Sequence, residues 1–323
     1  MTISTTNFWR RAPAALFPVC LGMIGIGLPW LSVAETMGGP KWFAGAWISV
    51  SAVAVLFCMA SYLAKLMVAP RVLLIDLNPA PGRAAVSAGS MCLLVLAAAL
   101  VRLTGAAQPA LALWCLGLGL HAVYALCVLY AIWADGLRNF RFSPVLFLPF
   151  VGFIVATFGG PDLGQKALSH YLFWAALPSF LLIFVFSAPR FLLWPTAIPQ
   201  RAAAAILLAP VSLLATASFI LGMERFFDLF FIAACAVAAG LLVGVRWLTA
   251  GGWTPLWGAF TFPLSAFTAT MVIAANRYGG AWEYAAWIVL IISSAIIAYL
   301  FTLTMWAWSR GRLAPATGAA TAS

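Results

Sequence analysis

The chain has 323 residues, of which 65% are hydrophobic and only 7% are charged. Soluble domains carry about 25% charged residues, so no soluble fold could bury this much apolar surface. A helix needs about 20 mainly apolar residues to cross a bilayer, so the chain has room for about ten crossings and for no separate soluble catalytic domain. We therefore expect an all-α membrane protein.

The net charge of +10 would suggest a nucleic-acid partner in a soluble protein. Here the basic residues fall in short loops between apolar runs, where membrane topology explains them better. We therefore expect membrane lipid, and no nucleic acid, around the protein.

Apolar runs between proline, glycine and charged residues predict ten transmembrane segments. The first half of the chain contains segments at 14–33, 43–68, 85–104, 109–133 and 143–160. The second half contains segments at 166–188, 203–222, 226–248, 254–275 and 282–308. They form one transmembrane domain over 14–308, between a cytoplasmic segment at 1–13 and a cytoplasmic tail at 309–323. The tail is rich in Ala, Thr, Gly and Pro, and we expect it to be disordered.

The basic residues indicate how the segments are oriented in the membrane. On one side lie twelve of them: Arg10, Arg11, Lys65, Arg71, Arg83, Arg138, Arg141, Arg190, Arg201, Arg246, Arg310 and Arg312. The other side holds Lys41, Arg102, Lys166, Arg225 and Arg277. The positive-inside rule then predicts a multi-pass protein with both termini in the cytoplasm, which we place in a bacterial inner membrane. A cleaved signal peptide over 1–34 is the alternative, but the ten-segment pattern needs its apolar run as the first helix.

Prolines concentrate in the odd-numbered segments. They are Pro18 in the first, Pro144 and Pro149 in the fifth, Pro210 in the seventh, and Pro255 and Pro263 in the ninth. An interior proline removes a helical hydrogen bond, and such broken backbone is tolerated at membrane depth only inside protein or beside a wet cavity. The bias favours an inner ring of kinked odd segments around a central path, although membrane helices carry extra proline in general. Pro178 in the sixth segment is an exception, and the third segment lacks proline.

Chemistry-bearing side chains are scarce in the segments. His121 lies in the middle of the fourth segment and His170 near the outer end of the sixth, without an acidic or cysteine partner for a haem or metal site. We interpret the cysteines as small hydrophobic residues and expect no cofactor; they are Cys20, Cys58, Cys92, Cys115, Cys127 and Cys235. No catalytic motif and no carboxylate pair appears, which argues against an enzyme. The lack of buried Asp or Glu argues against a tight cation site and favours an anion or a neutral solute.

Three stretches resemble the tellurite-resistance/dicarboxylate transporter family, which includes the slow anion channels of plants. The most specific is PLWGAFTFPLSAF at 255–267, and the others are LFPVCLGMIGIG at 16–27 and FSPVLFLPFVG at 142–152. The resemblance implies a homotrimer in which five helical hairpins form a central pore in each protomer. It also implies that Phe262 occludes this pore, and that Pro18, Pro144, Pro149, Pro210 and Pro263 kink or line it.

A phenyl ring can plug a narrow apolar tube, and rotation of that one side chain would open it. The alternative is that Phe262 is one of 24 phenylalanines that pack between helices. We expect transport of small anions through a Phe-gated pore. A proton-coupled C4-dicarboxylate or sulfite exporter is the alternative within transport, and a cofactor-binding subunit with His121 or His170 as ligand is the alternative outside it.

Overall fold

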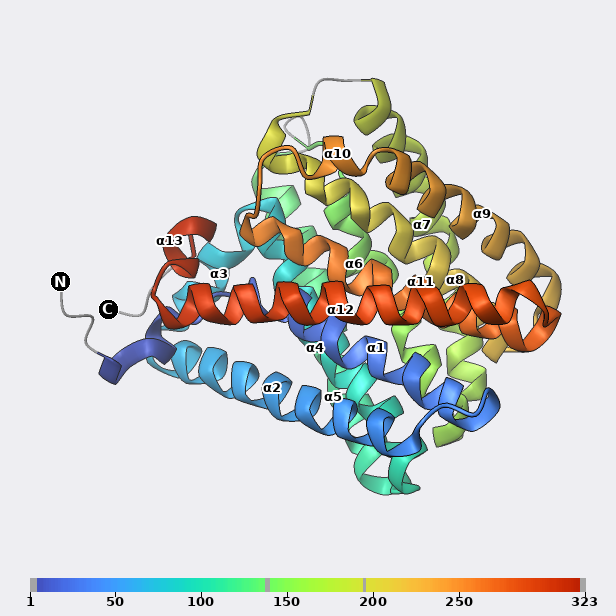
Figure 1. Ribbon diagram of the computed structural model, residues 1–323. Helices are drawn as coiled ribbons and strands as arrows, with labels where there is room; N and C mark the ends of the chain where they lie inside the picture. The colour runs from blue at the N-terminus through green and yellow to red at the C-terminus, as the bar shows by residue number, and fades with distance from the viewer. Residues whose placement is uncertain (1–4, 137–139, 194–195, 320–323) are drawn as a thin grey trace.

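The computed structural model describes residues 5–136, 140–193 and 196–319, and these residues form helices and no strand (Figure 1). Nine helical segments of this part of the chain are long and apolar enough to cross a membrane. They are α1 (Leu16–Thr36), α2 (Lys41–Val68), α4 (Ala80–Thr104), α5 (Ala107–Ala134), α7 (Lys166–Leu193), η5 with α8 (Ile198–Leu207 and Leu208–Ile220), α9 (Glu224–Val243), η6 with α11 (Pro255–Trp257 and Gly258–Tyr278) and α12 (Ala281–Ser309).

The predicted fifth segment is present as a shorter and irregular element. It consists of η2 (Pro144–Leu146), α6 (Phe147–Val151) and η3 (Gly152–Phe158). Pro149 removes a backbone donor inside this segment, and Gly152 weakens the regular helix by its conformational freedom. The expected count of ten membrane-length helices is therefore not reached among the described residues, because this segment changes from a 3-10 to an α-helix and back.

Odd-numbered segments occupy the interior of the molecule. In the most apolar part of α1 and of α4, 89% of the residues are buried, and the shares for Ile198–Ile220 and Pro255–Tyr278 are 83% and 67%. In α2, α5, α7, α9 and α12 the share lies between 22% and 33%. Figure 1 shows α12 running across the front of the molecule. The odd segments thus form an inner layer, and the even segments cover it and present apolar side chains outward.

The first and ninth segments meet at small residues. Thr261 of α11 donates a hydrogen bond from Oγ1 to the carbonyl oxygen of Pro18 at 2.8 Å. A Cβ on Gly22 of α1 would lie 2.8 Å from the backbone carbonyl carbon of Thr261. A methyl group therefore has no room between the two backbones.

Short elements connect the long ones. They are η1 (Thr5–Arg11), α3 (Arg71–Leu77), η4 (Pro161–Leu163), α10 (Val245–Leu248) and α13 (Leu313–Thr317), and η1 and α13 lie at the same end of the molecule (Figure 1). The tail differs from the expectation of disorder, because Leu313 and Ala314 are buried against the helices and the left-handed Gly318 ends α13. Arg138 and the side chain of Arg190, both used to orient the chain, lie outside the described residues, as do residues 1–4 and 320–323.

Replacing Gly22 by alanine is expected to lower the free energy of unfolding by about 1–3 kcal/mol, because the new methyl group overpacks the α1–α11 contact. The matched control is Gly45→Ala in α2, where a Cβ meets nothing within 4 Å. That control should be neutral or stabilising by up to about 1 kcal/mol, since alanine favours the helix. Thermal unfolding of both variants in detergent measures the difference, and equal melting temperatures would contradict the packing argument.

Candidate functional site

A cavity of about 560 Å³ opens at the end of the molecule where the inner segments begin. We call it the vestibule. All five odd segments contribute to its wall, together with the C-terminal residues 316–319. Its deep part is lined by Leu21, Ala85, Leu148, Ile206, Ala209, Phe262 and Pro263.

The backbone around the vestibule presents helix N-termini. Alternate segments run in opposite directions, so the odd segments all start at this end, and residues from the first turns of α1, α4, η5 and η6 line the cavity. None of these starts has a side-chain cap. Each helix N-terminus carries a positive partial charge of about half an elementary charge. The mouth therefore attracts anions without a basic side chain in the wall.

Of the six prolines named for the odd segments in the sequence analysis, Pro18, Pro255 and Pro263 line the vestibule, and so do Pro81 at the start of α4 and Pro199 at the start of η5. The chain neighbours of the other three line it instead, namely Val145, Leu148 and Ala209. Pro18 lies in the first turn of α1, where an N–H has no helical acceptor, so it begins this helix. Pro263 lies inside α11, and Pro210 lies just after the change from η5 to α8.

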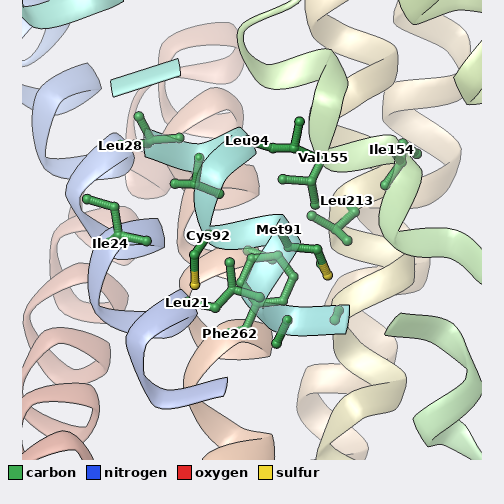
Figure 2. Close-up of a cluster of buried hydrophobic side chains, with 14 of the residues drawn as sticks. Leu21, Ile24, Leu28, Met91, Cys92, Leu94, Ile154, Val155, Leu213 and Phe262 are labelled. Atoms are coloured by element: carbon green, nitrogen blue, oxygen red, sulfur yellow. The ribbon is translucent and has the colours of Figure 1, made fainter. Parts of the chain in front are cut away.

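Phe262 lies at the deep end of the vestibule and is 5% exposed. Its ring lies among apolar side chains from the other inner segments (Figure 2). This apolar plug comprises Leu21, Ile24, Leu28, Met91, Cys92, Leu94, Ile154, Val155, Leu213 and Phe262. These buried side chains pack in the interior next to the vestibule.

An ion pair that the sequence did not suggest lies beside the vestibule. Lys65 Nζ is 3.2 Å from Asp76 Oδ2, and the two side chains are 0% and 3% exposed. Lys65 also donates to the carbonyl oxygen of Ala12 at 2.9 Å, and the Tyr62 hydroxyl donates to Asp76 Oδ2 at 2.9 Å. The expectation that no carboxylate is buried is therefore wrong at Asp76.

The contact between Lys65 and Asp76 follows from the ends of two helices. Helix α2 extends to Val68, so Lys65 lies in its last turn, and the short α3 returns Asp76 to the same place. Asp76 is the one charged residue among the described residues that line the vestibule, and Lys65 balances its charge. The available sequence signal was that Asp76, like Asp135, is an acidic residue on the otherwise basic side.

The two histidines are not brought together. His121 of α5 is fully buried, with Nδ1 2.8 Å from Ser90 Oγ and its ring edge-on to Phe153 at 4.5 Å. Because Ser90 Oγ donates its proton to the Ser87 carbonyl oxygen at 2.8 Å, His121 Nδ1 acts as the donor. His170 lies half-buried in the first turns of α7.

No group of three or more His, Cys, Asp or Glu side chains that could hold a metal ion occurs in the described part of the chain. All six cysteines are free, and Cys20, Cys58 and Cys92 are buried. Through its contact with Ser90, His121 joins the outer helix α5 to the inner helix α4. The ring also lies close to the fifth segment, because a Cβ on Gly152 would lie only 2.8 Å from its Cε1 atom.

Replacing Lys65 by methionine is expected to lower the free energy of unfolding by about 3–5 kcal/mol, because Asp76 would remain as an uncompensated buried charge. The double variant Lys65→Met with Asp76→Asn should recover most of this loss, since no buried charge is left. Denaturant titration of the single and double variants in detergent measures the coupling. A double variant that is no more stable than Lys65→Met alone would show that the two side chains do not stabilise each other.

Comparison with known proteins agrees with this geometry. Among curated proteins, none matched the chain. A family model described as voltage-dependent anion channel (SLAC1) matches residues 11–306, which include all the membrane-length segments except the last turn of α12. The chain therefore belongs to the voltage-dependent anion channel family and is a multi-pass membrane protein built for anion transport.

Proposed function

We propose that this protein conducts small anions along its five inner segments, from the vestibule past Phe262. The ring of uncapped helix N-termini around a wall with a single, neutralised charge carries the proposal. Thr254 adds a hydroxyl at the cavity wall, because its buried Oγ1 has no hydrogen-bond partner among the described residues. Such a site attracts an anion and holds it weakly, which permits conduction.

Phe262 is the proposed gate. Its ring lies in the plug and lines the vestibule together with Leu21, and an ideal Cβ on Gly25 of α1 would lie 3.6 Å from its Cδ2 atom. Gly25 presents no side chain toward the ring. Rotation of this side chain would join the vestibule to the interior and rehydrate the apolar plug.

The location, orientation and oligomeric state that we propose rest on the sequence and on the family resemblance. The charge distribution supports a bacterial inner-membrane protein with the vestibule and both termini on the cytoplasmic side. The exposed apolar side chains of the outer helices suit lipid contacts and a homotrimer. Membership of a channel family supports transport rather than catalysis, with no cofactor.

A proton-coupled exporter of C4-dicarboxylates or sulfite is the second candidate. The observation that favours it is Asp76, a carboxylate in the vestibule wall that receives hydrogen bonds from Lys65 and Tyr62. Carboxylates inside membrane proteins are the groups that form proton relays in transporters. Saturable flux driven by a pH gradient would support this candidate, and passive flux ranked by ease of anion dehydration would support the channel. Tellurite resistance, where it occurs, would then be a consequence of anion movement.

Replacing Phe262 by alanine is expected to raise anion flux about tenfold or more, because the side chain that closes the vestibule is removed. Proteoliposomes loaded with chloride, nitrate, sulfite or malate provide the measurement. The matched control is Phe260→Ala on the same helix, since Phe260 is half-buried, contacts Trp257 and does not line the vestibule.

The control should conduct like the wild type. Unchanged flux in Phe262→Ala, with equal amounts of folded protein in the vesicles, would rule out the gate. A similar increase in both variants would indicate general loosening of α11 instead.

A further inference from the structure

A second cavity, of about 380 Å³, lies behind the wall of the vestibule. We call it the polar cavity. Among the described residues its polar lining consists of Arg83, Asp135, Arg141 and Ser143, and its apolar lining of Ala80, Ile132, Phe140 and Leu146. The inner helix α4, the end of the outer helix α5 and the start of η2 meet here.

Arg83 is fixed by three hydrogen bonds that, in the described part of the chain, leave the N–H groups of Nη1 unused. Its Nε atom donates to the Leu77 carbonyl oxygen at 2.9 Å, and Nη2 donates to the Asn78 carbonyl oxygen at 2.9 Å and to Asp135 Oδ2 at 2.6 Å. The residue is 9% exposed, and within the described residues the two N–H groups of Nη1 have no hydrogen-bond partner. A buried guanidinium with two unused donors is a strong site for an oxyanion.

Two further donors border the same cavity. Arg141 is exposed and contributes a second guanidinium, whose Nη1 atom donates to the Phe140 carbonyl oxygen at 2.9 Å. The Ser143 hydroxyl makes no capping bond to η2. Two arginines and a hydroxyl around a space of this size match the several acceptor oxygens of a phosphate group.

The position of the polar cavity indicates where such a phosphate would come from. Tyr130 and Trp133, in the last turns of α5, are 64% and 68% exposed. Exposed Tyr and Trp on a membrane helix lie at the level of the lipid headgroups. Ile132 and Asp135, which line the cavity, belong to the same turns. Basic pockets between helices at this level are suited to anionic headgroups.

We propose that the polar cavity binds a phosphate group, supplied by an anionic phospholipid headgroup or by a free phosphate ion. The phosphate oxygens accept hydrogen bonds from Arg83 Nη1, Arg141 and Ser143, and the apolar side chains contact the glycerol part of a lipid.

Occupancy of the polar cavity would brace the wall of the vestibule. On α4, Arg83 faces the polar cavity while Ala84 and Ala85 line the vestibule. After η2 begins, Ser143 lines the polar cavity and Val145 lines the vestibule. One bound phosphate thus contacts both segments that separate the two cavities.

The test measures binding, so its outcome is independent of whether the protein conducts anions. Native mass spectrometry of the purified protein, titrated with phosphatidylglycerol, compares the wild type with Arg141→Gln and with Arg141→Gln plus Ser143→Ala. Arg83 is left intact because it also holds the chain at Leu77 and Asn78. The matched control is Arg246→Gln, an exposed arginine outside both cavities.

We expect Arg141→Gln to weaken lipid binding about tenfold, as for loss of one hydrogen bond to a charged group, while Arg246→Gln binds like the wild type. A second arm measures thermal stabilisation of delipidated protein by inorganic phosphate at constant ionic strength. Stabilisation that is lost in Arg141→Gln identifies free phosphate as a ligand, and lipid binding without it identifies the headgroup. Equal lipid binding in all variants, with no stabilisation by phosphate, would overturn the proposal.

Discussion

The structure depends on one constraint, which is that backbone polar groups in lipid must be bonded within the protein. The chain meets it with helices that cross and return through short connections such as Met37–Pro40 and Gly105–Ala106. Alternate crossings then run in opposite directions, so all inner segments begin at the same end. The vestibule forms where these N-termini converge, and its attraction for anions arises from the backbone rather than from side chains.

Broken backbone is confined to the interior for the same reason. The irregular fifth segment packs between α4, α7 and α8, so its carbonyl groups face protein rather than lipid. His121 depends on this irregularity, because its ring occupies the space left by the missing side chain of Gly152. Pro149 lies in the short α6 between two 3-10 segments, and Pro210 lies in the first turn of α8, directly after η5.

Hydropathy alone predicts membrane segments but does not distinguish inner from outer ones, because lipid and protein interior are equally apolar. Here the proline bias distinguished four of the five inner segments, and the burial of α1 against the exposure of α2 agrees with it, whereas α4 is equally buried although its predicted segment has no proline. Contacts between segments distant in sequence were not predictable in the same way. The Lys65–Asp76 pair requires the last turn of α2 to lie beside α3, and the polar cavity requires Arg83 to meet the end of α5. Neither of these two contacts leaves a periodic signal in the sequence.

The neutralised Lys65–Asp76 pair in the vestibule wall keeps the vestibule from binding an anion too tightly. A free lysine at the mouth would bind an anion strongly in a low-dielectric site and slow its release. Asp76 cancels the charge of Lys65 at 3.2 Å, and Tyr62 and the Ala12 carbonyl group use further hydrogen-bonding positions of the pair. The remaining attraction comes from several partial charges spread around the cavity. Such a field raises the local anion concentration while leaving each ion only weakly held, which is the balance that conduction requires.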